Sequence, residues 1–315
     1  MKTYIIGHIK PDLDSVVAAL AFAEYTKLNG VENPTPAIID TPNPETKFVF
    51  EKFNITPPAL ITATDILPED RVILVDHNEA DQRLVGLKPE QIIGIYDHHK
   101  ANINFSLPVE ICIMPFGSSN TVAWQLFKEI DYQLSTEIAT LMLCAILSDT
   151  VGLKSATTTQ KDRLAVSDLS NIAKITDIDS LTFEIFKAKS NIGSLSDEQV
   201  ITNDYKILDF GKKVFIGQTE TVEQDVLLNT RKAGLLNALQ SIKERDGYDF
   251  IFLAVTDILK INTKLLLTGI GESELAEKAF GGTVTDNILD IGTKMSRKKE
   301  INPAIEKAIS SLRGV

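Results

Sequence analysis

Short apolar runs that each end at a polar residue are the feature of this sequence that most restricts its fold. The three runs are Tyr4–Gly7, Val72–Val75 and Ile92–Tyr96, and the residues that follow them are His8, Asp76 and Asp97. Segments with helix-like composition, such as 119–130 and 136–147, come after the strands. Alternation of buried strands and helices predicts an α/β fold with a parallel sheet. Ligands of such sheets bind beyond the carboxyl ends of the strands, so we expect these polar side chains to converge there.

The 315 residues divide at a small, polar stretch that includes Gly193. Domains average roughly 150 residues, so two domains are expected. We predict a first domain at residues 1–189, a linker or hinge at 190–197, and a smaller α/β domain at 198–315. The second domain should contain a mixed sheet, because the strands at 204–210 and 213–219 turn back across Gly211. A single helix over 225–245 is expected after them.

All four histidines fall within three short motifs, which is the strongest indication of a functional site. The first motif carries His8, Asp12 and Asp14 on the turn between a strand and a helix expected at 16–28. Imidazole and carboxylate groups together suit Mn²⁺, Fe²⁺, Co²⁺ or Zn²⁺. The simpler interpretation is that Asp14 and Ser15 cap the helix. The other two motifs are Asp76-His77-Asn78 and Asp97-His98-His99-Lys100.

Asp149 ends an apolar helix, at a position where its negative charge opposes the helix dipole. A bound cation would offset that cost. Two metal ions about 3.5–4 Å apart need one bridging carboxylate and separate terminal ligands. Asp76 is the candidate bridge, and the candidate terminal ligands are His8, Asp12, Asp14, His98 and Asp149. A further motif, Ser296-Arg297-Lys298-Lys299, is most simply a solvated basic run when it is taken by itself.

In this order along the chain, the motifs resemble those of the DHH phosphoesterase superfamily. The narrower similarity is to the family II, manganese-dependent inorganic pyrophosphatases, whose C-terminal domain is of the DHHA2 type. The resemblance covers nearly the whole chain and includes Val255-Thr256-Asp257-Ile258 and the basic run at 296–299. It implies an N-terminal parallel-sheet DHH domain, a smaller C-terminal DHHA2 domain with a mixed sheet, and an active site in the cleft between them.

The resemblance also implies a role for each site residue. One metal ion would be bound by His8 and Asp12, the other by Asp14, His98 and Asp149, and both by Asp76. His99 would be a hydrogen-bond donor or general acid at the phosphate, and Asp97 would orient the histidines without being a ligand. The substrate would be held from the second domain by Lys206, Arg297 and Lys298. The implied reaction is hydrolysis of pyrophosphate, or of a similar small phosphoanhydride, by a hydroxide that bridges the metals.

The implied cofactors are two Mn²⁺ per subunit, with Co²⁺ as an alternative and Mg²⁺ accompanying the substrate. A homodimer formed through the first domain is implied as well. Cys112 and Cys144 lack the spacing of a metal or redox pair, which predicts reduced thiols in a cytoplasmic protein. Met1–Ile9 runs directly into a strand, so we expect no signal peptide, and no apolar run is long enough to span a membrane.

Three places depart from the family's pattern. Leu13 stands between two aspartates, where a small polar residue is usual, although its side chain need not face the metals. Lys100 replaces the usual arginine after the histidine pair, which keeps the charge and loses a bidentate fork. The stretch Pro115–Asn120 matches only loosely.

The sequence also bears on several other functions. The net charge of −11 disfavours non-specific binding to nucleic acid or an anionic membrane. A relative that cleaves oligonucleotides or cyclic dinucleotides should carry a histidine in its glycine-rich last-domain motif, and Gly281-Gly282-Thr283 has none. A short-chain exopolyphosphatase needs the same residues, so it stays an alternative. Two functions of other classes are also disfavoured. An inert binding protein should have lost metal ligands, and here every expected ligand is present. A nucleotide-binding switch should carry a GxxxxGK(S/T) or GxGxxG stretch, and this sequence has neither.

Overall fold

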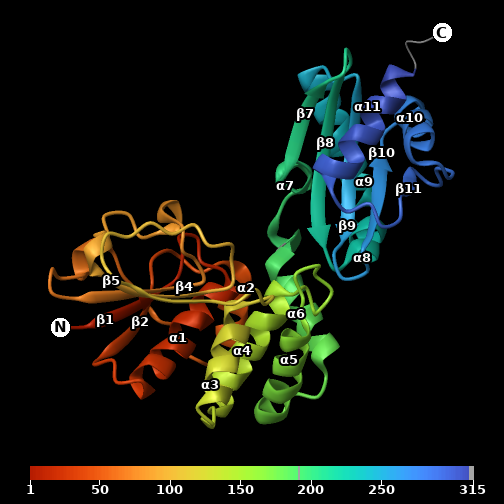
Figure 1. The fold of residues 1–315 in the computed structure, drawn as a ribbon. Coiled ribbons are helices and arrows are strands. Elements are labelled where there is room, and N and C mark those ends of the chain that lie inside the picture. Colours follow the sequence, from red (N-terminus) through yellow and green to blue (C-terminus); the bar gives the residue numbers. More distant parts are fainter. Residues whose placement is uncertain (191, 312–315) are drawn as a thin grey trace. The chain divides into compact units, whose positions relative to one another are not determined.

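The structure is a computed structural model that describes residues 1–190 and 192–311. The chain forms two compact units, Met1–Lys189 and the residues from Ser190 onward (Figure 1). The predicted linker at 190–197 includes residue 191, which lies outside the described residues, as do residues 312–315 of the predicted second domain. The described part of that linker contains the short helical turn Ile192–Ser194. Among the described residues, no helix combines the length and apolar character needed to cross a membrane.

The first unit is built on a six-stranded parallel sheet in the order β3-β2-β1-β4-β5-β6. The strands are β1 (Thr3–Ile6), β2 (Pro34–Ile38), β3 (Ala59–Leu60), β4 (Arg71–Val75), β5 (Ile92–Asp97) and β6 (Glu110–Ile113). The predicted parallel α/β sheet is therefore confirmed. The three strands that carry the polar ends, β1, β4 and β5, are direct neighbours at its centre.

Helices cover one face of this sheet, and loops cover the other (Figure 1). The helices are α1 (Leu13–Leu28), α2 (Pro44–Lys52), α3 (Ser119–Glu129), α4 (Thr136–Asp149), α5 (Gln160–Ala173) and α6 (Ile178–Ser190). Ile5, Ile73 and Val75 point into the helical layer, whereas Ile6 and Leu74 point to the loop side, as the twofold period of a strand requires. Helix α4 is buried on all sides from Ala139 to Ser148, which fits its continuous apolar sequence.

The start of α1 differs from the prediction. The helix begins at Leu13, and Asp12 is the N-cap, because its backbone is extended and its side chain accepts the Ser15 N–H at 3.0 Å. The prediction that Asp14 and Ser15 cap a helix from residue 16 was therefore wrong. Asp14 lies in the first turn instead, almost fully buried, and its carboxylate is available for other contacts.

The second unit contains a five-stranded mixed sheet in the order β11-β10-β9-β8-β7. The strands are β7 (Tyr205–Asp209), β8 (Lys213–Thr221), β9 (Phe250–Asp257), β10 (Asn262–Leu267) and β11 (Ile288–Asp290). Only β8 and β9 pair in parallel, so the predicted mixed sheet is confirmed. Side chains alternate between two cores, with Val214 and Phe252 on one face and Phe215 and Ile251 on the other.

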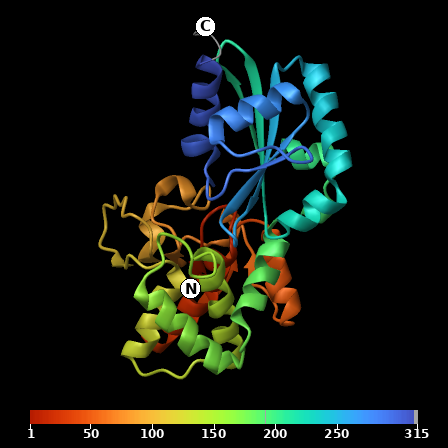
Figure 2. The same cartoon turned by 90° about the vertical axis from the view of Figure 1, so that its right-hand side faces the viewer.

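Helices lie on both faces of this second sheet (Figure 2). They are α7 (Asp197–Thr202), α8 (Gln224–Thr230), α9 (Lys232–Asp246), α10 (Ile270–Phe280) and α11 (Asn302–Ser310). The single helix predicted over 225–245 was wrong, because the chain leaves helical geometry at Arg231 between α8 and α9. The Arg231 guanidinium binds Asp197 at 2.7 Å and the carbonyls of Ile192 and Leu195. These contacts hold the first residues of the unit against the junction of α8 and α9.

Candidate metal centre

The carboxyl ends of β1, β4 and β5 bring His8, Asp76 and His98 to one edge of the first sheet. Asp76 adopts a left-handed backbone conformation with φ of 59°, which only a few residue types tolerate easily. Its N–H donates to the carbonyl of Tyr96 on β5 at 3.0 Å. The chain therefore turns sharply after β4 and holds the Asp76 carboxylate, which is 2% exposed, over the strand ends.

The two oxygens of Asp76 face two different groups of side chains. Oδ2 lies 3.3 Å from Nε2 of His8, and Oδ1 lies 3.4 Å from Nε2 of His98. The first group consists of His8, Asp12 and Asp76, and its potential ligand atoms all lie within 4.8 Å of one another. The second group consists of Asp14, His98 and Asp149, within the same limit. The family resemblance implied the same division of ligands, which stays a prediction until bound cations are located.

Asp14 of the second group is enclosed by the N-terminus of α3. The Ser119 N–H donates to Asp14 Oδ2 at 2.7 Å, Asn120 Nδ2 donates to Oδ1 at 2.9 Å, and the Ser118 hydroxyl also donates to Oδ1. Asp149, the last residue of α4, lies 3.4 Å from His98 Nε2. Three distant parts of the chain thus meet in the second group.

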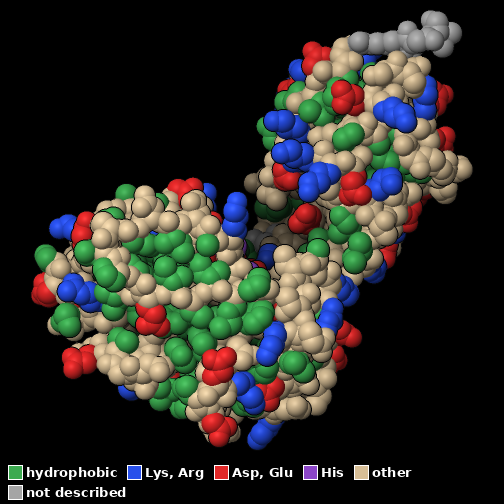
Figure 3. All heavy atoms as spheres, viewed as in Figure 1, with side chains coloured by type: hydrophobic (Ala, Val, Ile, Leu, Met, Phe, Trp, Pro, Cys, Tyr) green, Lys and Arg blue, Asp and Glu red, His purple; other side chains and the backbone are tan. Residues whose placement is uncertain are grey.

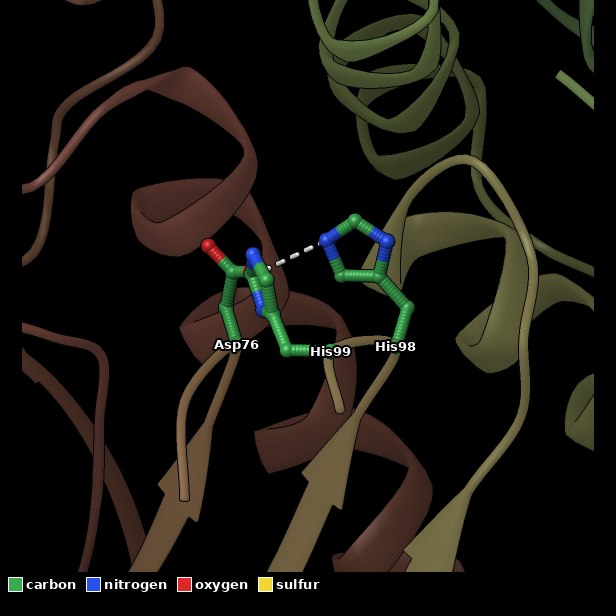
Figure 4. Close-up of side chains that lie close together, drawn as sticks. All are labelled: Asp76, His98 and His99. Atoms are coloured by element: carbon green, nitrogen blue, oxygen red, sulfur yellow. Dashed lines mark ion pairs between the residues drawn. The ribbon is translucent and has the colours of Figure 1, made fainter. Parts of the chain in front are cut away.

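His99 lies beside Asp76 and His98, as Figure 4 shows, and the three can also group around one cation. The fully buried Asp97 accepts the Nδ1–H of His99 at 2.9 Å and both backbone N–H groups of His98 and His99. Burial works to raise the pKa of Asp97, but the hydrogen bonds from His99 and Asn78 outweigh it and lower that pKa. Asp97, which we expected to orient the histidines without being a ligand, belongs to none of the ligand groups found among the described residues.

The carboxylates are too crowded to be charged together without compensation. Burial and the neighbouring charge of Asp76 raise the pKa of Asp14 to about 7, and burial with the charge of Asp14 raises that of Asp149. Burial would lower the pKa of His8, but hydrogen bonds with Asp12 and Asp76 raise it to about 11. The protein alone therefore stabilises bound protons here, which cations could replace. Imidazole nitrogens with carboxylate oxygens form a donor set that fits Mn²⁺.

A cavity of about 360 Å³ opens at the first group, and its lining includes His8, Asp76, His99, Glu79, Asp81 and Gln82. His77, the fourth histidine, also contacts it but belongs to no ligand group found among the described residues. Its Nδ1 lies 2.9 Å from the carbonyl of Val75, and its side chain is buried. The His77 ring therefore packs against the turn after β4 and bonds to its backbone.

The cationic residues predicted to hold substrate lie in the second unit. Arg297 and Lys298 line a pocket of about 400 Å³ together with Gln218 and Glu220. Arg297 Nη2 donates to Asp204 at 2.6 Å, while its buried Nη1 has no hydrogen-bond partner in the described part of the chain. Lys206 is exposed on β7, two residues after Asp204. Arg297 therefore keeps donor capacity for a bound anion.

Sequence reasoning missed the residues that surround the ligands. Asn78 is fully buried, donates to Asp97 at 2.6 Å and accepts the N–H of Asn102 at 2.6 Å. The stretch 115–120, which was noted only for departing from the family pattern, holds Asp14 and Asp76. Of the two other departures, Leu13 packs in the core and Lys100 is exposed. A polar residue in a loop carries no signal of such a contact until the fold is known.

Comparison with known proteins finds two family domains in this chain. Residues 2–146 match the DHH family N-terminal domain, and residues 183–308 match the DHHA2 domain. The chain is 37% identical over 314 residues to the manganese-dependent inorganic pyrophosphatase of Methanocaldococcus jannaschii, covering 97% of this chain and 98% of that protein. It is 37% identical over 309 residues to the manganese-dependent inorganic pyrophosphatase of Methanothrix thermoacetophila, covering 97% of each.

A solved structure is similar as well. The crystal structure of a Methanococcus jannaschii protein assigned to the family II inorganic pyrophosphatases aligns with a TM-score of 0.61 and 36% identity, covering 98% of this chain and 99% of that one. Both family domains and the full-length relatives lead to the same assignment. The chain therefore belongs to the DHH phosphoesterase superfamily and, within it, to the family II, manganese-dependent inorganic pyrophosphatases.

Proposed function

We propose that this protein hydrolyses inorganic pyrophosphate to two phosphates and depends on Mn²⁺. The observation that carries the proposal is the Asp76 carboxylate, which offers one oxygen to each of two His/Asp groups. A shared carboxylate between two ligand sets is what a pair of cations acting on one phosphate requires. Relatives with this name align over nearly the full chain, which supports the same conclusion.

The six proposed ligands divide between two cations per subunit. His8, Asp12 and Asp76 would hold the first, and Asp14, His98 and Asp149, with the second oxygen of Asp76, would hold the other. When bound, the two cations would lower the pKa of a shared water to supply hydroxide and would polarise the phosphoryl oxygens. His8 is prepared for binding, because its Nδ1 contacts the carbonyl of Ile9 at 2.7 Å and its Nε2 is left facing Asp76.

His99 is the proposed proton donor to the departing phosphate. Its hydrogen bond with Asp97 raises its pKa, which favours the protonated form that a proton donor needs. The bond also fixes Nδ1, which leaves Nε2 free to reach a phosphate oxygen. The His99 side chain is 49% exposed and lines the cavity at the first group, so a bound anion can contact it.

Lys206, Arg297 and Lys298 are proposed to contact the same pyrophosphate, with residues 190–197 as the hinge. Arg297 suits paired phosphate oxygens because its guanidinium presents two parallel donors, and Lys298 supplies a point charge. Fixed positive charges stabilise the negative charge that develops during phosphoryl transfer. We expect the combined change Arg297→Ala and Lys298→Ala to abolish most turnover with Mn²⁺ binding intact. Wild-type turnover in that variant would refute this assignment of the cations.

The substrate is tested by phosphate release from pyrophosphate and from tripolyphosphate, each with Mn²⁺, Co²⁺ or Mg²⁺. We expect pyrophosphate with Mn²⁺ to be hydrolysed fastest, with Co²⁺ able to substitute. Faster release from tripolyphosphate would identify a short-chain exopolyphosphatase on the same ligands. No release from either compound by Mn²⁺-loaded protein would contradict the proposed function.

A homodimer formed through the first unit is also proposed. Strand β6 is an edge strand that pairs only with β5, and Ile111 on it is 47% exposed. Hydrophobic side chains gather on the face of the first unit seen in Figure 3, and edges of this kind are natural sites for pairing with another chain. Sedimentation measurements would test the dimer.

We also propose that the protein is cytoplasmic. Both cysteines are free thiols, which supports this location.

A further inference from the structure

The segment Phe116–Asn120 contacts three of the six proposed ligands, although none of its residues is itself one of them. The carbonyl of Phe116 lies 3.0 Å from Nδ1 of His98. The hydroxyl of Ser119 donates to Asp76 Oδ1 at 2.9 Å, and its N–H donates to Asp14. Helix α1 and strands β4 and β5 each present one of these ligands, so a single short segment sets how the three stand relative to one another.

Asp162 fastens this segment on both sides. This residue is fully buried in the first turn of α5. Both of its carboxylate oxygens lie 3.0 Å from the N–H of Gly117, and Oδ1 accepts the Thr121 hydroxyl at 2.6 Å. Thr159 holds the same carboxylate from the other side, with its N–H at 2.6 Å and its hydroxyl at 2.7 Å. Asp162 thus joins the start of α5 to the residues that flank Ser118, Ser119 and Asn120.

Burying the Asp162 carboxylate costs free energy, and joining two helices does not by itself require that burial. The unpaired charge is compensated only by hydrogen bonds, since no Lys or Arg ion pair to Asp162 occurs in the described part of the chain. A neighbouring contact joins the same two helices without such burial, because Asp168 of α5 accepts the indole N–H of Trp124 on α3 at 2.9 Å and is 35% exposed. The buried position of Asp162 is therefore explained by the segment it holds.

We propose that Asp162 is a positioning residue for the metal centre, which acts through Gly117 and Thr121 on the segment that orients Asp14, Asp76 and His98. This inference rests on the proposed function, because it assumes that those three side chains bind cations. Hydrogen-bond partners that orient metal ligands typically change metal affinity by about 10–100-fold when they are removed. Asp162 contacts the segment and not the ligands themselves, but the segment orients three ligands together. We therefore expect the Mn²⁺ affinity to fall by at least about tenfold when Asp162 is replaced.

The test is a titration of chelator-treated protein with Mn²⁺ alone, in which free Mn²⁺ is followed by electron paramagnetic resonance. The variants are Asp162→Asn, Thr121→Val and the matched control Asp168→Asn. We expect two bound ions in the wild type and in Asp168→Asn. At least one ion should bind about tenfold more weakly in Asp162→Asn, with a smaller change in the same direction for Thr121→Val. Melting temperatures are measured in parallel for all four proteins.

The outcomes separate this inference from the proposed function. If the wild type binds no Mn²⁺, the proposed metal centre and this inference both fail. If the wild type binds two ions and Asp162→Asn binds them equally well, the inference is overturned and the proposed function stands. Weakened binding that follows the loss of melting temperature equally in Asp162→Asn and Asp168→Asn would reduce Asp162 to a purely structural role. If Asp162→Asn does not fold, wild-type affinity in Thr121→Val overturns the inference.

Discussion

Replacing Gly117 with alanine is the sharpest test of the packing around the metal centre. The added Cβ would lie 2.7 Å from Cγ2 of Thr150 and 3.0 Å from Oδ2 of Asp162. Carbon atoms prefer a separation of about 3.5–4.0 Å, so the new methyl group overlaps Thr150 by roughly an ångström. Neither neighbour can move easily, because both side chains are fully buried and hydrogen-bonded, Thr150 to the carbonyl of Ile146 and Asp162 to Thr159.

The size of the effect follows from these contacts. An inserted methyl group in a well-packed interior costs about 1–3 kcal/mol. Displacing Gly117 also weakens its N–H bond to the Asp162 carboxylate, which adds about 1–2 kcal/mol. Lower entropy of the unfolded chain returns about 0.4–1 kcal/mol. We therefore expect a loss of about 1–5 kcal/mol, which lowers the melting temperature of a unit of this size by roughly 2–20 °C.

Urea unfolding followed by tryptophan fluorescence is a suitable assay, because the single tryptophan, Trp124, is buried in α3 of the first unit. Gly94→Ala provides the matched control in the same unit. There the nearest atom to the new Cβ is Cγ1 of Ile73 at 3.2 Å, a looser contact than the 2.7 Å at Gly117, so a smaller loss is expected. Equal losses in the two variants, or a wild-type midpoint in Gly117→Ala, would refute this account of the packing.

Three further predictions follow from the site and its surroundings. Mn²⁺ at 100 times its dissociation constant should stabilise the first unit by about 2.7 kcal/mol per site, seen as a higher melting temperature that a chelator reverses. The Mn²⁺ affinity should keep rising between pH 6 and pH 8.5 in titrations at each pH, because His8 and His98 hold protons with pKa values of about 11 and about 10 and must lose them to bind a cation; a plateau above pH 7 would contradict this. Lys189→Ala should destabilise the first unit by about 1–3 kcal/mol in urea, since it removes the ammonium group 3.2 Å from the fully buried Glu45, which is then left with its hydrogen bonds from Asn43 and Ser148. The control Lys52→Ala, which breaks a more exposed pair with Glu184, should cost below about 1 kcal/mol.

The strands and the histidine motifs could be predicted because their signals are local. An apolar run that ends at His8 or Asp76 shows both the strand and the polar end within a few residues. The carboxyl ends of parallel strands meet at one edge of a sheet, and the observed strand order places those of β1, β4 and β5 side by side there. The α/β fold and its two sheets, parallel and mixed, were predictable for this reason.

Other features depend on contacts between distant residues and could not be predicted. The cap of α1 is Asp12, although Asp14 is an equally good capping residue, because the position of α3 draws the Asp14 carboxylate to Ser119 and Asn120. Helix propensity favours a continuous helix over 225–245, yet contacts of Arg231 with Asp197 accompany a break there. In both cases tertiary hydrogen bonds decide between local conformations of similar energy.

The negative charge of the chain also takes on a different meaning at the site. A net charge of −11 would repel pyrophosphate if it were spread evenly. Four of the carboxylates, however, are concentrated in the two ligand groups, where two divalent cations would cancel them. The substrate would then meet the field of the cations and of the nearby imidazoles, not the average field of the surface. Such a centre must bind its cations before it can bind its substrate, so at low Mn²⁺ the affinity for pyrophosphate should fall with the loss of either ion.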